Sequence, residues 1–228
     1  MIRKTKIIST IGPVSFKKYV LKKLIKEGTN FIRINTSYGS YKQYDLILEN
    51  LETIRGKKDI KVIYDIKKTE VLNYFKKKNL DIVAVSFTES KEQLQKIQNI
   101  LPDTPLIAKI ESKKGIENFD EILKSSWGIM IARGDLGKAV SLEKIPCIQR
   151  DLVKRALKKK KFLIVATEML LSMTDNPSPS RAEVSDVATA VFEKASAVML
   201  SEETAIGKYP VLAVKYMRNI INEAEKCC

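Results

Sequence analysis

Histidine is absent from this chain of 228 residues, and that absence excludes several classes of functional site. No serine–histidine–aspartate triad can form, and no metal can be bound through imidazole. Cysteine is scarce: Cys147, Cys227 and Cys228 lack the spacing of a zinc site, so we expect reduced thiols. No apolar run reaches the ~18 residues of a membrane span, and residues 1–10 lack the apolar core of a signal peptide. The sequence therefore predicts a cytoplasmic protein with no membrane partner.

Positive charge is the feature present in excess. Lys and Arg number 41 against 27 Asp and Glu, which gives a formal net charge of +14. Such a balance is typical of nucleic-acid-binding proteins. However, the lysines are spread over every predicted helix, and no aromatic residues alternate with them. We interpret them as solvated helix faces, and nucleic-acid binding stays open as a less favoured alternative.

Short apolar runs rich in β-branched residues alternate with amphipathic segments along the whole chain. This alternation predicts an α/β fold, a closed (β/α)8 TIM barrel that occupies residues 1–228 as a single domain. An open doubly wound sheet is the alternative, but Ile11-Gly12-Pro13 stands where its glycine-rich fingerprint would follow the first strand. The eight expected strands are residues 4–11, 31–35, 61–65, 81–87, 105–111, 128–132, 162–167 and 195–200.

The fifth and sixth expected strands carry the densest set of candidate site residues. Lys109 and Glu111 share one face at the end of the fifth strand, and Asp135 closely follows the sixth. Because a helix predicted at residues 115–124 joins them, the two strands are expected to lie parallel and adjacent. Glu111 and Asp135 would then meet at the carboxyl edge of the sheet. Two carboxylates beside a lysine suit a divalent cation and an anionic substrate.

Several longer motifs identify a family. In chain order they include RKTKIISTIGP, FIRINTS, AKIESKKGIENFDEIL, GIMIARGDLG and SRAEVSDVATAV. Together these segments resemble the barrel domain of pyruvate kinase, and the resemblance covers nearly the whole chain. It implies an enzyme that transfers the phosphoryl group of phosphoenolpyruvate to ADP, giving pyruvate and ATP, with Mg²⁺ and K⁺ as cofactors.

The resemblance also implies a role for each matching residue. Lys109 matches the catalytic lysine, Arg33 the arginine that binds the phosphoryl group, and Thr167 the threonine linked to protonation of the enolate. Glu111 and Asp135 match the Mg²⁺ ligands. The other matches are the K⁺ ligands Asn35, Ser37, Asp65 and, through its carbonyl, Ile66; the substrate-pocket pair Ser86 and Phe87; and the backbone amides of Ala132, Arg133, Gly134 and Asp135, which with Thr167 would hold the substrate carboxylate.

The sequence departs from the family pattern mainly around the nucleotide. We expect a short connection near residues 68–80 in place of the lid domain that the family inserts after the third strand, and we expect no C-terminal regulatory domain after the eighth helix. Tyr38 stands where histidine is usual, and Glu202 replaces a glycine. We expect the missing lid to weaken catalysis, because a lid excludes water and contacts the nucleotide phosphates.

The leading hypothesis is a minimal pyruvate kinase-like enzyme, slow and unregulated, that forms a homodimer through its outer helices. Two alternatives stay open. One is an enzyme that performs enolate chemistry without a nucleotide, such as an oxaloacetate decarboxylase. The other is a catalytically degenerate relative that acts as a binding or regulatory protein, for example toward an RNA-containing assembly.

Overall fold

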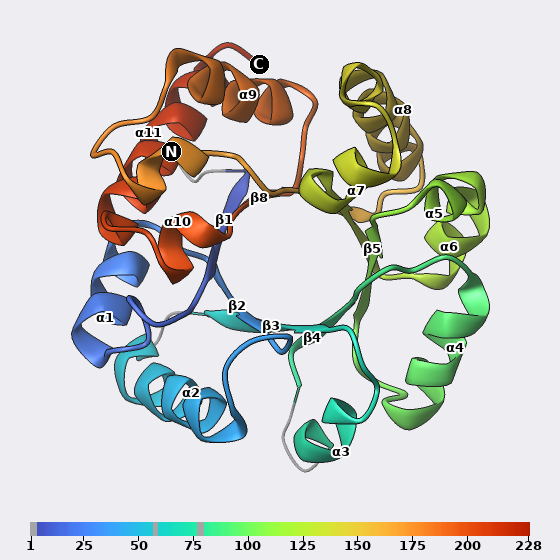
Figure 1. The fold of residues 1–228 in the computed structure, drawn as a ribbon, viewed down its shortest axis with the longest axis horizontal. Coiled ribbons are helices and arrows are strands. Elements are labelled where there is room, and N and C mark those ends of the chain that lie inside the picture. The colour runs from blue at the N-terminus through green and yellow to red at the C-terminus, as the bar shows by residue number, and fades with distance from the viewer. Residues whose placement is uncertain (1–3, 57–58, 77–79) are drawn as a thin grey trace.

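Eight parallel strands close into a barrel in chain order, as Figure 1 shows. The computed structural model describes residues 4–56, 59–76 and 80–228. This closure confirms the predicted (β/α)8 barrel and excludes the open sheet. The strands are β1 (Lys6–Thr10), β2 (Phe31–Asn35), β3 (Lys61–Ile66), β4 (Ile82–Val85), β5 (Leu106–Ile110), β6 (Gly128–Ala132), β7 (Phe162–Ala166) and β8 (Ala197–Leu200).

Helices surround the barrel, with extra short helices at the strand ends (Figure 1). The α-helices are α1 (Lys18–Glu27), α2 (Tyr41–Arg55), α3 (Val71–Phe75), α4 (Lys91–Ile100), α5 (Lys113–Glu117), α6 (Phe119–Ser125), α7 (Arg133–Ala139), α8 (Ile145–Lys158), α9 (Arg181–Phe192), α10 (Glu202–Ala205) and α11 (Pro210–Lys226). Two 3₁₀ helices, η1 (Leu142–Lys144) and η2 (Leu171–Thr174), complete the set.

Most expected strand ends shift by one or two residues, and two further differences have a visible cause. The single helix expected at residues 115–124 is divided at Asn118 into α5 and α6. The Asn118 side chain donates to the Glu89 carbonyl at 2.7 Å, a long-range bond that ties Asn118 to the loop after β4. The strand expected at residues 81–87 ends at Val85, because Phe87 adopts a left-handed backbone with φ of +48°.

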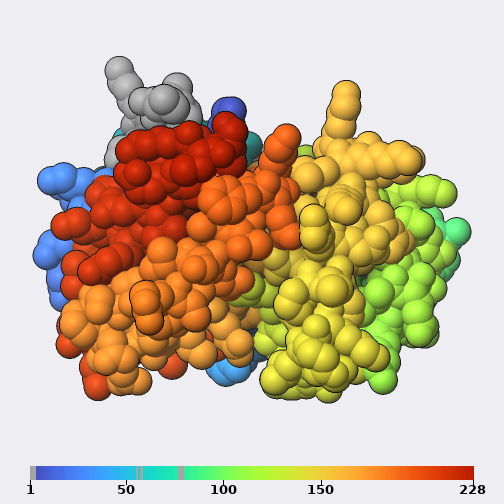
Figure 2. Space-filling model, turned by 90° about the horizontal axis from the view of Figure 1, so that it is seen from above, coloured from blue at the N-terminus to red at the C-terminus, as the bar shows by residue number. Residues whose placement is uncertain are grey.

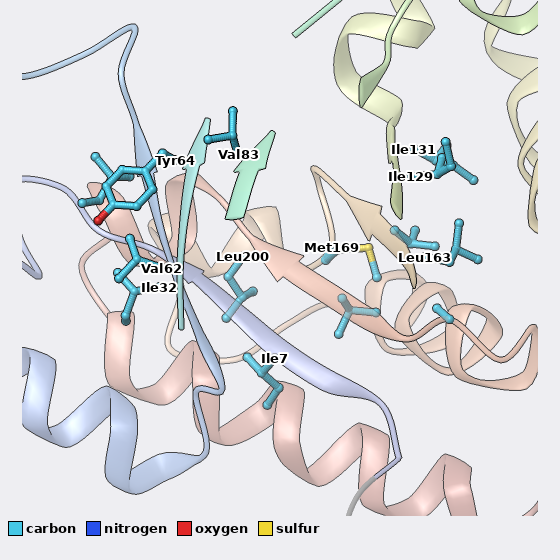
Figure 3. Close-up of a cluster of buried hydrophobic side chains, with 14 of the residues drawn as sticks. Ile7, Ile32, Val62, Tyr64, Val83, Ile129, Ile131, Leu163, Met169 and Leu200 are labelled. Atoms are coloured by element: carbon cyan, nitrogen blue, oxygen red, sulfur yellow. The ribbon is translucent and has the colours of Figure 1, made fainter. Parts of the chain in front are cut away.

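The barrel sheet separates two hydrophobic cores, because successive side chains along each strand point to opposite faces of the sheet. Outward residues pack against the helices, and Figure 3 shows this layer with Ile7, Ile32, Val62 and Leu163 among the labelled side chains. Inward residues fill the barrel in a smaller cluster of Ile8, Ile63, Ile82, Ala84, Ile107, Met130, Ile164, Ala166, Ala197 and Met199. The barrel is therefore a packed core with no pore.

The inward positions change from apolar to charged toward the carboxyl end of the strands. In β3 the inward residue Ile63 is followed by Asp65, and in β5 Ile107 is followed by Lys109. Both charged side chains are almost fully buried. The strand period therefore brings polar groups together over the apolar floor of the barrel.

The connection between β3 and β4 runs over residues 67–81 and contains only the short helix α3 among its described residues. Residues 77–79 of the predicted lid replacement lie outside the part that the structure describes. Within the described ranges no helix has the length and apolarity needed to cross a membrane. The three cysteines are free and exposed.

Glu183 in the first turn of α9 joins this helix to η2. Its carboxylate accepts from the Ser172 amide at 2.7 Å, the Ser172 hydroxyl at 2.5 Å and the Ser180 amide at 2.7 Å. Burial would raise the pKa of Glu183, but the bonds from Ser172 and Ser180 outweigh it and leave the pKa below its ordinary value of 4.5. Folding therefore favours the ionised carboxylate.

We predict that Glu183→Gln lowers the free energy of unfolding at pH 7 by about 1–2 kcal/mol. A carboxylate with a depressed folded pKa stabilises the protein above its unfolded pKa and loses that effect as the pH falls through the folded value. The difference in the free energy of unfolding between wild type and Glu183→Gln should stay constant from pH 7 to about 5 and narrow below about 4.5. Urea unfolding across this range measures it, with the surface variant Glu223→Gln as control; a difference independent of pH would contradict the assignment.

Candidate active site

A cavity of about 480 Å³ opens at the carboxyl ends of the strands. Its walls come from the barrel strands and from the loops and short helices that follow them. This is the face on which barrel enzymes place their chemistry. The lining residues are Arg33, Asn35, Ser37, Tyr38, Lys67, Ser86, Phe87, Lys109, Glu111, Met130, Ala132, Gly134, Asp135, Lys138, Thr167, Glu168, Leu171, Met199, Ser201 and Glu202.

Four buried charges form the floor of this cavity. Asp65 accepts from Arg33 Nε at 2.8 Å and from Arg33 Nη2 at 2.7 Å. Lys109 Nζ lies 3.0 Å from both oxygens of Asp65 and 3.1 Å from Glu111 Oε1. The two cations and two carboxylates balance in a cluster whose side chains are at most 8% exposed. Such compensation is required, because an unpaired buried charge is strongly destabilising.

Strand register explains how distant residues meet in this cluster. Thr10, Arg33 and Ile63 follow one another across β1, β2 and β3 as ladder partners, and Asn35 pairs with Asp65. Arg33 also donates to the Thr10 hydroxyl at 3.0 Å, which holds the guanidinium from the far side. Because Arg33 and Asp65 both point inward, they meet without any contribution from loops.

The two carboxylates of the cluster have opposite electrostatic surroundings. Burial would raise the pKa of Asp65, but the charges of Arg33 and Lys109 outweigh it and hold the pKa below its ordinary value. Burial dominates at Glu111 and raises its pKa, although Lys109 and the Phe87 amide favour the ionised form. The ionised form of Asp65 is thus favoured, and it is the shared counter-ion of the two cations.

The loop after β4 brings Ser86 and Phe87 to the charges. Ser86 Oγ donates to Asp65 Oδ1 at 3.1 Å and accepts from Lys109 Nζ at 3.0 Å. The Phe87 amide donates to Glu111 Oε2 at 2.7 Å from its left-handed backbone. A non-glycine residue in that conformation costs about 1–3 kcal/mol, so the carboxylate bond must hold it in place. Lys67 extends over the Phe87 ring, with Nζ 5.3 Å from the centroid.

Thr167 closes the opposite wall of the cavity, directly after β7. Its hydroxyl accepts from the Gly134 amide at 2.7 Å and donates to the Ala166 carbonyl at 2.5 Å. The Gly134 amide in the first turn of α7 therefore already has a partner in the absence of substrate. The Arg133 side chain does not line the cavity: it pairs with Asp186 at 2.6 Å, so only its main chain can contribute to the predicted substrate site.

Glu111 and Asp135 reach the same cavity, as expected for a pair of Mg²⁺ ligands. Glu111 pairs with Lys109, whereas the more exposed Asp135 pairs with Lys138 at 2.8 Å, one helical turn away. No group of three or more acidic or cysteine side chains in the described part of the chain forms a closed metal site. Two carboxylates facing an open cavity fit Mg²⁺, which usually completes its shell with water and substrate oxygens.

The expected K⁺ ligands lie at the ends of β2 and β3. Asn35 and Ser37 line the cavity, and the Asn35 side-chain oxygen accepts from the Ser37 amide at 3.1 Å. The Ile66 side chain packs outward in the helix-facing core, and its carbonyl accepts from the Ser86 amide at 2.9 Å. An amide oxygen, a hydroxyl, a carboxylate and a carbonyl form a donor set that fits a hard monovalent cation.

The predicted site residues converge on one place. All of them line the cavity except Asp65, which lies buried beneath it, Ile66 and Arg133. The prediction missed Lys138, although its position three residues after Asp135 on one helix was a usable signal. It also missed the contact of Thr10 with Arg33, which depends on strand pairing that the sequence does not display.

A second cavity of about 310 Å³ adjoins the first. The two share Arg33, Asn35, Tyr38, Ser201 and Glu202 as wall residues. The remaining lining is largely apolar and aromatic: Thr10, Ile11, Gly12, Pro13, Ile34, Gly39, Gln43, Tyr44, Ile47, Ala205 and Ile206. The barrel mouth therefore offers a charged compartment next to an apolar one.

Comparison with known proteins gives a consistent result. A family model described as "Pyruvate kinase, barrel domain" matches residues 2–73 and 57–214. The pyruvate kinase of Chlamydia muridarum is 48% identical over 160 residues, which cover 68% of this chain and 33% of that protein. For the pyruvate kinase of Borreliella burgdorferi the identity is 45% over 155 residues, covering 66% and 32%. The chain thus spans about a third of the length of these curated relatives.

A solved structure agrees at the level of the fold. The crystal structure of a pyruvate kinase from Cryptosporidium parvum superposes with a TM-score of 0.94 at 24% sequence identity. The match covers 99% of this chain and 70% of the other. Its likeness supports the barrel architecture.

We predict that Asp65→Ala lowers the free energy of unfolding by about 3–5 kcal/mol, because it leaves two buried cations without their shared counter-ion. The matched control is Asp175→Ala, which removes an exposed pair with Lys208. That control should change the stability by less than about 1 kcal/mol. Denaturant unfolding of both variants makes the comparison, and similar losses at the two positions would contradict the cluster's role.

Proposed function

The chain belongs to the pyruvate kinase family, and from that membership we propose that it transfers the phosphoryl group of phosphoenolpyruvate to ADP, giving pyruvate and ATP. The observation that carries the proposal is the Lys109 ammonium, buried between Asp65, Glu111 and Ser86 on the floor of the cavity. A fixed cation at a dry site stabilises negative charge far better than a lysine in water.

Arg33 and Lys109 have the positions needed to bind a phosphoryl group. Both line the cavity while Asp65 fixes their orientation, so little reorganisation is needed when charge develops on the phosphate oxygens. In the transfer, the P–O bond to the enol oxygen breaks and a P–O bond to the terminal oxygen of ADP forms. When bound, Mg²⁺ at Glu111 and Asp135 and K⁺ at Asn35, Ser37, Asp65 and Ile66 would neutralise phosphate and enolate charge.

The enolate left by this transfer must take up one proton at its terminal carbon. Lys109 would hold the enolate oxygen, and the Thr167 hydroxyl on the opposite wall would relay the proton from solvent. The amides in the first turn of α7 would hold the substrate carboxylate. The Gly134 amide donates to the Thr167 hydroxyl and so fixes the orientation of that hydroxyl.

The adjoining apolar cavity is the proposed site for ADP. Tyr38 and Tyr44 give it aromatic surface for a base, and Arg33 stands in the wall between the two compartments. A nucleotide seated there would direct its phosphates past Arg33 toward the charged compartment. The described residues of the connection between β3 and β4 form only the short helix α3 and no inserted domain, so we expect slow phosphate delivery with competing hydrolysis.

A second candidate is enolate chemistry that needs no nucleotide, such as decarboxylation of oxaloacetate to pyruvate. It is favoured by one observation: the buried charges of the substrate side are complete, whereas departures such as Tyr38 and Glu202 fall in the wall that the charged and apolar cavities share. In that reaction the C–C bond to carbon dioxide breaks and the same enolate remains on Lys109. Metal-assisted chemistry of this kind uses only the charged compartment.

We further propose that the chain forms a homodimer through α9. Figure 2 shows the outside of the barrel where α9 (orange) lies between α11 (red) and α8 (yellow). Val184 and Phe192 of α9 are 36% and 50% exposed on a helix that carries no lysine. Large apolar residues exposed on one helix suit a contact between copies.

We predict that Lys109→Met abolishes pyruvate formation from phosphoenolpyruvate and ADP, with a loss of at least about 1,000-fold in kcat. The assay couples pyruvate to NADH oxidation in the presence of Mg²⁺ and K⁺. Lys208→Met, which changes an exposed lysine, serves as the control and should retain activity.

Three outcomes would redirect the assignment. Absence of activity in the wild type would overturn phosphoryl transfer to ADP. Pyruvate formation from oxaloacetate that ignores ADP but requires Glu111 would favour the decarboxylase. Absence of both activities, together with salt-sensitive RNA binding, would favour the degenerate binding protein.

A further inference from the structure

The turn after β7 holds two consecutive non-glycine residues in the left-handed region. Thr167 has a φ of +71° and Glu168 a φ of +54°. Threonine is especially unfavourable there, because its β-branched side chain crowds the backbone. Such a turn persists only where contacts from other segments fix it.

Arg133 of α7 supplies those contacts from behind the turn. Its Nη2 donates to the Thr167 carbonyl at 2.8 Å and to the Met169 sulfur at 3.0 Å. Its Nη1 pairs with Asp186 of α9 at 2.6 Å. The Arg133 side chain is only 12% exposed, and Met169 belongs to the buried layer seen in Figure 3. The guanidinium is therefore a fixed bridge between the turn and α9.

The same turn of α7 holds Thr167 from the cavity side. The amide of Gly134, the residue after Arg133, donates to the Thr167 hydroxyl at 2.7 Å. The adjacent residues Arg133 and Gly134 thus donate hydrogen bonds to the carbonyl and the hydroxyl of Thr167. A shift of the carbonyl would move the hydroxyl relative to the cavity, because both groups belong to one strained residue.

We infer that Arg133 is a positioning residue for Thr167: it fixes the left-handed turn through the Thr167 carbonyl, and Asp186 on α9 anchors it. This inference rests on the proposed function, in which the Thr167 hydroxyl relays a proton to the enolate. It gives Arg133 a role that needs no contact between its side chain and the substrate. It also extends the active site to α9, on the outside of the barrel.

The kinetic test is a double-mutant cycle with phosphoenolpyruvate and ADP. Arg133→Met should lower kcat by about 10- to 100-fold, as expected for a displaced reacting group, and leave the KM for phosphoenolpyruvate unchanged. In a Thr167→Val background the same substitution should cause no further loss, because Arg133 acts through Thr167. Arg155→Met, which removes ion pairs with Asp120 and Asp151 elsewhere on the surface, should leave kcat unchanged.

Losses of kcat that multiply in the double variant, or a raised KM for phosphoenolpyruvate, would overturn the inference.

A second measurement works without enzymatic activity. Hydrogen exchange of the Gly134 amide should be at least about ten-fold faster in Arg133→Met than in wild type, with the Ile164 amide in β7 as internal reference. Faster exchange confined to Gly134 supports the inference even if kinase activity is absent, whereas unchanged exchange, or equal acceleration at Ile164, overturns it.

Discussion

The buried cluster of Arg33, Asp65, Lys109 and Glu111 is the interaction on which the rest of the site depends. Its charges balance inside the barrel, where an uncompensated charge would be prohibitively unfavourable. The cluster also restricts the strand register. A slip of β3 by one residue would turn Asp65 from the interior toward the apolar layer under the helices and would remove the counter-ion that Arg33 and Lys109 share. The charge pairing in the cluster therefore depends on the strand register, and the register is in turn restricted by the charge pairing.

Around this cluster, strained loops are held by contacts from distant parts of the chain. The left-handed Phe87 is held by Glu111, and the left-handed Thr167 by Gly134 and Arg133. Phe87 and Thr167 both line the cavity, so their backbone conformations set what the cavity presents to a ligand. At these two positions the strain lies where the site needs a fixed geometry, while the apolar layers below supply the stability that tolerates it.

Much of this arrangement could be predicted from the sequence. The alternation of strands and helices predicted the closed barrel, and the period of two placed Lys109 and Glu111 on one face, where they form an ion pair. Local patterns did not predict the break at Asn118, because it depends on a bond to the Glu89 carbonyl, 29 residues away. They likewise gave no indication that Arg133 turns away from the cavity toward Asp186, 53 residues further along the chain.

The sequence by itself determined the fold class, the face of the barrel that carries the polar residues and the family, since periodicity and motifs are local properties of the chain. Only the tertiary structure decided how those residues are paired. Asp65 forms ion pairs with both Arg33 and Lys109, Asp135 forms an ion pair with Lys138, and the Thr167 hydroxyl accepts a hydrogen bond from the Gly134 amide of α7. The reason is physical. Partner choice among buried charges and strained loops depends on distances across the barrel, which arise only when all eight strands close.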